Sequence, residues 1–309
     1  MKAGVIGVGK LGKIHARIYA ELDAFELVGV TDPRHPGQEH LHGSAWTRDC
    51  SELLALGVEA VTIATPTVNH HEVAKFFLDH GVHCLIEKPI AVTMAEAEDL
   101  LETASRKQAF LMVGMIERFN KAYTEARKMI TAPMFIESHR LGPFPNRSLD
   151  VSVVLDLMIH DLDIILDLVG DEVASVEGVG VKALTDKADI ANARIHFKGG
   201  CIANITASRI SEEQMRRTRV FFNHNYISLD FAEHTIKAFK SGDHGIEKRV
   251  IAIEMEEPLK REICHFHAGI TAERRDYTLA KNAVMALDLA LKIDEDLAKR
   301  QTQLRNPVQ

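Results

Sequence analysis

The chain has 309 residues, of which 46% are hydrophobic and 26% charged, a composition typical of a globular protein with room for two domains. A net charge of -7 without a dominant basic patch argues against nucleic-acid binding. No apolar run approaches the ~20 residues that span a bilayer, and the first residues do not resemble a signal peptide. The four cysteines are widely spaced, so we expect a cytoplasmic protein with reduced thiols.

The 16 histidines raise the question of a metal site. The closest pairs are His70 with His71 and His265 with His267, and none has the spacing of a zinc or metalloprotease motif. We therefore expect no metal and interpret these histidines as surface or capping residues.

The first part of the sequence alternates short apolar runs with amphipathic stretches, which predicts βαβ units and a parallel sheet. A helix is expected over residues 10–20, where Leu11 and Ile18 share a face. Thr93 and Glu96 have the spacing of a capping box and predict the start of a later helix. Strands are expected at residues 3–8, 26–32, 58–65, 82–87 and 110–115.

Beyond Gly114 the pattern changes to β-type runs in series, which implies an antiparallel sheet because no helices separate the strands. Helices are expected over residues 117–130, 153–169 and 277–299, and a proline-rich loop over residues 142–146. The strands are expected at residues 133–141, 176–181, 191–197, 201–208, 218–222, 226–231 and 249–253.

Gly7, Gly9 and Gly12 form a G-x-G-x-x-G sequence between the first predicted strand and helix, and Asp32 lies at the end of the second strand. This context indicates a dinucleotide-binding turn, although a glycine turn in an unrelated α/β protein is the alternative. A carboxylate at position 32 repels a 2′-phosphate and favours NAD, while nearby Arg34 keeps NADP as the alternative cofactor. The residues that we assign to the cofactor are Gly7, Gly9, Lys10, Leu11, Gly12, Asp32, Thr65, Pro66, Asn69, Glu87 and Lys88.

Two further motifs carry candidate chemistry. Lys88, in the sequence Glu87-Lys88-Pro89, follows a parallel strand at the edge where α/β sheets bind ligands, and it can donate to a developing carbonyl oxygen. Asp156 and His160 are four residues apart on one predicted helix, so the carboxylate can orient the histidine and raise its basicity. An ordinary surface lysine and a surface i, i+4 pair are the alternatives.

These three motifs, in this order, resemble the glucose–fructose oxidoreductase/inositol dehydrogenase (Gfo/Idh/MocA) family along essentially the whole chain. The resemblance implies an α/β Rossmann domain, residues 1–117, with a doubly wound parallel sheet. It also implies an α+β domain, residues 118–309, with a large, mostly antiparallel open sheet and a last helix packing back toward the first domain. The implied catalytic residues are Lys88, which polarises the substrate oxygen, Asp156, which orients the group, and His160, which exchanges the hydroxyl proton.

Residues 113–120, 140–145 and 207–211 look like the UDP-N-acetylglucosamine 3-dehydrogenase branch of this family, although Met115 stands where a histidine is expected. The resemblance implies NAD-dependent oxidation at C3 of a UDP-N-acetylhexosamine, and a PLP aminotransferase that acts next. The implied substrate ligands are Arg118, Asn120, Arg140 and Arg209, with domain-interface salt bridges as the alternative for the arginines.

Two other functions share this fold: a dehydrogenase of a free polyol or sugar, and a non-catalytic NAD-binding regulator. The presence of Lys88, Asp156 and His160 argues against the regulator, and the arginines favour the nucleotide sugar. We also expect a homo-oligomer, a dimer or tetramer, because a broad apolar sheet face is unfavourable in water.

Overall fold

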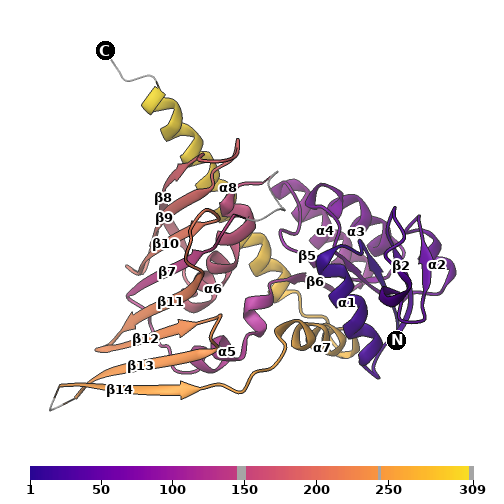
Figure 1. Cartoon of the computed structure of the whole chain (residues 1–309), viewed down its shortest axis with the longest axis horizontal. Helices are drawn as coiled ribbons and strands as arrows, with labels where there is room; N and C mark the ends of the chain where they lie inside the picture. The colour runs from indigo at the N-terminus through magenta and orange to yellow at the C-terminus, as the bar shows by residue number, and fades with distance from the viewer. Residues whose placement is uncertain (145–150, 243–244, 306–309) are drawn as a thin grey trace. The chain divides into compact units, whose positions relative to one another are not determined.

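The computed structural model describes residues 1–144, 151–242 and 245–305. The chain divides into two compact units, the first formed by Met1–Met115 with Glu257–Val284 and the second by Ile116–Glu256 with Met285–Gln309 (Figure 1). Of the predicted loop at 142–146, residues 145 and 146 lie outside the described residues. No helix in the described part of the chain has the length and apolar character needed to cross a membrane.

The first unit contains a six-stranded parallel sheet with the order β3-β2-β1-β4-β5-β6. The order reverses between β1 and β4, which makes the carboxyl ends of these two strands the topological switch point of a doubly wound sheet. The strands are β1 (Lys2–Ile6), β2 (Glu26–Thr31), β3 (Ala45–Thr47), β4 (Ala60–Ile63), β5 (His83–Glu87) and β6 (Leu111–Gly114).

The helices expected over residues 10–20 and after Thr93 are present as α1 and α4, whereas α2 and α7 were not predicted. Thr93 Oγ1 accepts from the Glu96 N–H at 3.3 Å, and the Glu96 carboxylate accepts from the Thr93 N–H at 3.1 Å, which confirms the capping box. The longer of the two unpredicted helices is α7, whose Phe266 stacks on Phe110 at 5.9 Å between ring centroids. The helices are α1 (Lys10–Glu21), α2 (Glu52–Ala55), α3 (His70–Asp79), α4 (Met94–Lys107) and α7 (Pro258–Thr271), with short 3-10 turns η1 (Gln38–His40) and η2 (Thr67–Asn69).

The second unit contains an eight-stranded sheet with the order β14-β13-β12-β11-β7-β10-β9-β8 (Figure 1). All neighbouring strands are antiparallel except β7 and β10, which run parallel. The expected combination of a Rossmann sheet with a mostly antiparallel open sheet is therefore confirmed. The strands are β7 (Phe135–Leu141), β8 (Val173–Val181), β9 (Ile190–Phe197), β10 (Ile202–Ser208), β11 (Met215–Phe222), β12 (Asn225–Asp230), β13 (Thr235–Gly242) and β14 (Gly245–Ala252).

Helices cover one face of this second sheet (Figure 1). Buried Ile136 and Ser138 of β7 point to that face, and small residues on β8 let α8 approach closely, since a Cβ at Gly180 would lie 2.9 Å from Leu297. The predicted helix at 117–130 is divided into a 3-10 turn and α5. The helical segments are η3 (Ile116–Phe119), α5 (Lys121–Arg127), the π-helical turn η4 (Val154–Met158), α6 (Ile159–Val169) and α8 (Thr278–Arg305), of which α8 belongs to this unit only from Met285 onward.

Candidate active site

The glycine turn lies at the switch point of the first sheet, between β1 and α1. Gly7 has φ +86°, and a Cβ there would lie 2.7 Å from Ala64, while a Cβ at Gly12 would lie 1.8 Å from the Gly7 carbonyl oxygen. An added Cβ at Gly9 would meet nothing within 4 Å. Gly7 and Gly12 are therefore required by packing, whereas Gly9 leaves open space in front of the first N–H groups of α1, which suits a bound pyrophosphate.

Asp32 follows β2 beside this turn, and its carboxylate is held by the backbone. Oδ2 accepts from the Val8 N–H at 2.9 Å and Oδ1 accepts from the Arg34 N–H at 3.0 Å. The indole N–H of Trp46 donates to the Asp32 carbonyl oxygen at 3.1 Å. These bonds fix a carboxylate next to the glycine turn, in the place where a ribose binds in dinucleotide folds.

The ends of β4 and β5 carry the other residues assigned to the cofactor. Pro66 and Asn69 are exposed in the turn after β4, and Thr65 is half-buried. Lys88 is half-buried directly after β5. Because β1, β4 and β5 are neighbours in a parallel sheet, these turns lie along one edge together with the glycine turn.

Glu87 differs from the expectation, because its side chain faces the interior. It is 8% exposed, and its Oε1 lies 2.8 Å from Nε2 of His15 on α1. A direct contact of this carboxylate with the cofactor thus has no support in the structure. Glu262 of α7 is also fully buried, and its burial, together with the charge of Glu87, raises its pKa well above the usual range.

His70 lies between two turns of the candidate site, a place that the sequence interpretation did not assign to it. It was expected at the surface or as a cap, but only 1% of it is exposed. Its Nδ1 lies 2.8 Å from the Pro89 carbonyl oxygen and its Nε2 lies 2.9 Å from the Thr65 carbonyl oxygen. His70 thus joins the two turns that carry Lys88 and Thr65.

Asp156 and His160 belong to the second unit. The expected uninterrupted α-helix over 153–169 is instead a π-helical turn, η4, followed by α6, so Asp156 lies in the π turn and His160 in the first turn of α6. A π turn has hydrogen bonds between residues i and i+5 in place of i and i+4, and such turns are frequent at functional sites. Asp156 is 9% exposed and His160 is half-buried.

Arg118 and Arg140 hold the helix that carries His160. Arg140 donates from Nε to Asp161 at 2.6 Å and from Nη1 to Glu117 at 2.9 Å. Arg118 donates from Nε to Asp163 at 2.6 Å and from Nη2 to the same carboxylate at 2.8 Å. Burial works against the charge of Arg140, but the neighbouring carboxylates outweigh it and raise its pKa.

The two other residues assigned to the substrate also have structural partners. Asn120 caps α5, with its Oδ1 accepting from the Ala122 N–H at 3.0 Å. Arg209 is 1% exposed and donates from Nε to Asp189 at 2.9 Å. Substrate binding by Arg118, Asn120, Arg140 and Arg209 stays a prediction.

Each unit thus gathers part of the predicted chemistry. The first brings together the glycine turn, Asp32, the Thr65 turn and Lys88, and the second brings together Asp156 and His160. Met115 is buried at the end of the first unit. Among the described residues, no group of three or more histidine, cysteine, aspartate or glutamate side chains is arranged to hold a metal ion.

Comparison with known proteins supports this arrangement. Residues 1–115 match the model of the GFO/IDH/MocA oxidoreductase family with an NAD-binding Rossmann fold, and residues 128–228 match the GFO/IDH/MocA C-terminal domain. The chain is 38% identical over 304 residues to UDP-N-acetylglucosamine 3-dehydrogenase from Acidithiobacillus ferrooxidans, covering 95% of this chain and 96% of the relative.

The likeness extends to solved structures and to other dehydrogenases. A crystal form of the Acidithiobacillus ferrooxidans enzyme superimposes with a TM-score of 0.91 at 37% identity, covering 96% of this chain and 97% of that one. The scyllo-inositol 2-dehydrogenase (NAD(+)) of Bacillus subtilis is 29% identical over 233 residues, 68% of each chain. The chain therefore belongs to the GFO/IDH/MocA family of oxidoreductases.

Proposed function

We propose that this enzyme uses NAD to oxidise the C3 hydroxyl of a UDP-linked N-acetylhexosamine to a 3-keto sugar. The observation that carries the proposal is the similarity to UDP-N-acetylglucosamine 3-dehydrogenase, at 38% identity over 95% of this chain. The more distant inositol dehydrogenase matches only 68% of the chain. Both relatives are dehydrogenases of ring alcohols, so the proposal concerns the substrate rather than the reaction class.

The residues at the switch point fit a dinucleotide. Open space at Gly9 and the N-terminus of α1 suit a pyrophosphate, and Asp32 suits a ribose with a free 2′-hydroxyl. When bound, NAD accepts the hydride that the alcohol carbon gives up. We propose NAD over NADP because the Asp32 carboxylate would repel a 2′-phosphate. Asp32→Ala should narrow the difference between the Kd values of the two cofactors, and tighter NADP binding by the unmodified enzyme would contradict the preference.

The chain's own groups would supply the proton chemistry. Oxidation of the alcohol releases a proton from oxygen, and we assign its acceptance to the imidazole of His160, oriented by Asp156. The Lys88 ammonium would donate a hydrogen bond to the same oxygen as it becomes a carbonyl. Arg118 and Arg140 contribute by holding α6, because they bind Asp163 and Asp161, which both lie in the helical turn that follows His160.

Replacing the acid–base groups tests this assignment. His160→Ala and Lys88→Ala should each lower kcat by roughly 100-fold or more. The Kd for NADH should change little in His160→Ala, because this residue belongs to the second unit. Near-normal turnover in His160→Ala would remove it from the mechanism.

The diphosphate of a nucleotide sugar needs a cationic partner, and Arg216 is a further candidate. It lies on β11 opposite Arg140 of β7. Strand alternation places its side chain on the same face of the sheet as the buried residues Thr218 and Val220. Unlike these two residues, Arg216 is exposed. UDP alone should compete with the substrate, with competition weakening as salt rises. Arg216→Gln should raise the inhibition constant of UDP.

A free polyol or sugar is the alternative substrate, favoured by the inositol dehydrogenase relative. Such an enzyme needs no site for a diphosphate. Activity on scyllo-inositol or glucose that UDP fails to inhibit would favour this alternative. A non-catalytic regulator would bind NADH but turn over neither class of compound.

We also propose that the chain self-associates through the uncovered face of the second sheet. Phe135, Phe221, Tyr226 and Phe239 form one row across neighbouring strands, with ring centroids 5.8, 5.0 and 4.3 Å apart in sequence. A second copy of the chain would remove this apolar row from water. Phe239→Asp should shift the mass measured by light scattering toward the monomer, and an unchanged mass would place any interface elsewhere.

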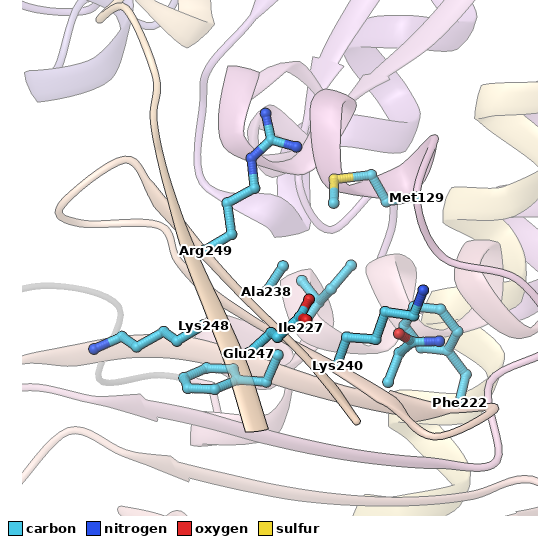
Figure 2. A pocket seen from close by; sticks show the side chains of 10 residues that line it. Met129, Phe222, Ile227, Ala238, Lys240, Glu247, Lys248 and Arg249 are labelled. Atoms are coloured by element: carbon cyan, nitrogen blue, oxygen red, sulfur yellow. The ribbon is translucent and has the colours of Figure 1, made fainter. Parts of the chain in front are cut away.

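A pocket of about 380 Å³ lies nearby in the same unit, lined by strands β11 to β14 and Met129 (Figure 2). Figure 2 shows Lys240, Lys248 and Arg249 around it, but none of the residues assigned to the substrate or to catalysis. We therefore do not place the substrate there.

The proposed reaction also suggests which enzyme acts next and where in the cell the reaction takes place. Oxidation of a secondary alcohol by NAD is unfavourable near neutral pH, so an enzyme that removes the ketone would draw the reaction forward. We propose a PLP aminotransferase in this role, and a cytoplasmic location, where NAD and nucleotide sugars are both supplied. Adding such an aminotransferase with an amino donor should increase the amount of NADH formed.

A further inference from the structure

His70 occupies a position that links two neighbouring turns of the first unit. It is the first residue of α3 and is almost fully buried, at 1% exposure. Its ring lies between the carbonyl oxygens of Thr65, 2.9 Å from Nε2, and Pro89, 2.8 Å from Nδ1. Thr65 belongs to the turn after β4, and Pro89 directly follows Lys88 after β5.

The two partners constrain the chemistry of the ring. A carbonyl oxygen only accepts hydrogen bonds, and a neutral imidazole has a single N–H, so a neutral ring donates to one turn at a time. Only the imidazolium donates to both. Burial lowers the pKa of His70, while the bonds to Pro89 and Thr65 oppose this change. The charges of Glu87 and Lys88 also act on the ring, in opposite directions.

The backbone around Lys88 is thereby fixed on both sides. His70 contacts the carbonyl of Pro89, the residue after Lys88, and His15 binds the side chain of Glu87, the residue before it. Both histidines come from helices that follow other strands of the sheet. The position of Lys88 thus depends on contacts from α1 and α3 as well as on its own strand.

We propose that His70 is a positioning residue for Lys88: its ring holds the Pro89 carbonyl and so sets where the Lys88 ammonium lies relative to the cofactor turn. This inference rests on the proposed catalytic role of Lys88. Displacing a catalytic group by about 1 Å costs on the order of 100-fold in rate, so loss of the Pro89 bond should reduce kcat. Loss of the Thr65 bond should instead affect cofactor binding.

Three substitutions separate these effects. His70→Phe keeps an aromatic ring but removes both nitrogens, and with them the contacts to Pro89 and Thr65. The amide nitrogen of His70→Asn lies near the place of Nδ1 and can donate to Pro89, whereas that of His70→Gln reaches the place of Nε2 and can donate to Thr65. We expect His70→Phe and His70→Gln to lower kcat with UDP-N-acetylglucosamine by 10- to 100-fold, and His70→Asn to stay within a few-fold of the unmodified enzyme.

Two readouts do not require turnover. Hydrogen exchange of the backbone amides at residues 90–92, measured without cofactor, should accelerate in His70→Phe and His70→Gln but not in His70→Asn. The Kd for NADH, measured by fluorescence, should rise in His70→Phe and His70→Asn but stay near normal in His70→Gln. His80→Gln, at an exposed histidine that ends α3, is the matched control and should change neither.

The double variant Lys88→Ala/His70→Phe decides whether His70 acts through Lys88. If it does, the double variant is no slower than Lys88→Ala alone, because the positioned group is already missing. Two results would overturn the inference and leave His70 a structural residue. The first is a double variant whose loss of kcat equals the two single losses combined. The second is an equal loss of kcat in His70→Phe, His70→Asn and His70→Gln that parallels a lower urea midpoint in each. Normal turnover in Lys88→Ala would instead contradict the proposed function. A slow Lys88→Ala with a normal His70→Phe would contradict only the positioning role.

Discussion

Replacing Arg140 by methionine tests whether this arginine holds the fold or binds substrate. The Arg140 side chain is 5% exposed and donates to Asp161 at 2.6 Å and to Glu117 at 2.9 Å, and the side chains of these acceptors are 2% and 10% exposed. Methionine fills a similar volume but leaves both carboxylates buried without the guanidinium. We therefore expect the second unit to lose stability while the first unit is unaffected.

The magnitude follows from the bonds that are lost. A hydrogen bond to a charged group contributes about 1.5–3 kcal/mol, so two short ones give roughly 3–6 kcal/mol. Breaking one partner of a buried ion pair costs about 3–5 kcal/mol by direct measurement in other proteins. We predict a loss of about 4 kcal/mol at pH 8.

The assay must report on the second unit. The single tryptophan, Trp46, lies in the first unit, so its fluorescence would follow the wrong part of the chain. Hydrogen exchange of the backbone amides in β7 and α6, measured over a range of urea concentrations, reports on the second unit itself. Arg219→Met is the matched control, because Arg219 and Glu137 pair at 2.9 Å with 39% and 32% of their side chains exposed. That pair should contribute less than about 1 kcal/mol.

The opposite outcome would be informative. If Arg140→Met costs no more stability than Arg219→Met but raises the KM for the nucleotide sugar, then Arg140 is a substrate ligand. The structural role of its bonds to Asp161 and Glu117 would then be refuted.

Three further variants test other titratable residues of the fold. Burial and nearby Arg275 lower the pKa of His83 to about 4, below its usual value of about 6.5. The neutral form that the fold requires is therefore fully present in the unfolded chain above pH 6.5, and stability is lost as pH falls toward 4. In His83→Asn, the urea midpoint should depend less on pH over this range. Burial raises the pKa of Glu262, so its ionisation costs stability as pH rises, and Glu262→Gln should raise the urea midpoint more at pH 8 than at pH 5. Asp189→Asn should cost about 3 kcal/mol, at the lower end for a buried pair, because Arg209 keeps its bonds to the Val151 carbonyl and the Thr185 hydroxyl.

Much of the first unit could be predicted from the sequence, because its signals are local. The glycine turn, the capping box at Thr93 and the apolar strands each lie within a few neighbouring residues. The short strand β3 (Ala45–Thr47) was not predicted, because three residues are too few to show the alternation of a strand. Helix α7 had a signal, with Leu259, Ile263, Phe266 and Ile270 at helical spacing, but charged residues and histidines between them obscured it.

The roles of the buried polar residues could not be predicted, because their partners are distant in sequence. Arg140 and Asp161 are 21 residues apart and meet only when α6 packs on β7. A buried arginine with two carboxylates and a ligand-binding arginine look the same in a sequence. The same holds for His70, whose partners Thr65 and Pro89 belong to two different turns. The sequence spacing of Asp156 and His160 also did not reveal the π turn that contains the first of them.

The most direct test of the proposed function uses UDP-N-acetylglucosamine with deuterium at C3. Incubation with NAD, followed by mass spectrometry of the NADH, reports which carbon gives up its hydride. The proposed reaction predicts deuterated NADH from this substrate and unlabelled NADH from the same sugar labelled at C4. Unlabelled NADH from the C3-labelled sugar, or turnover of scyllo-inositol without turnover of the nucleotide sugar, would contradict it.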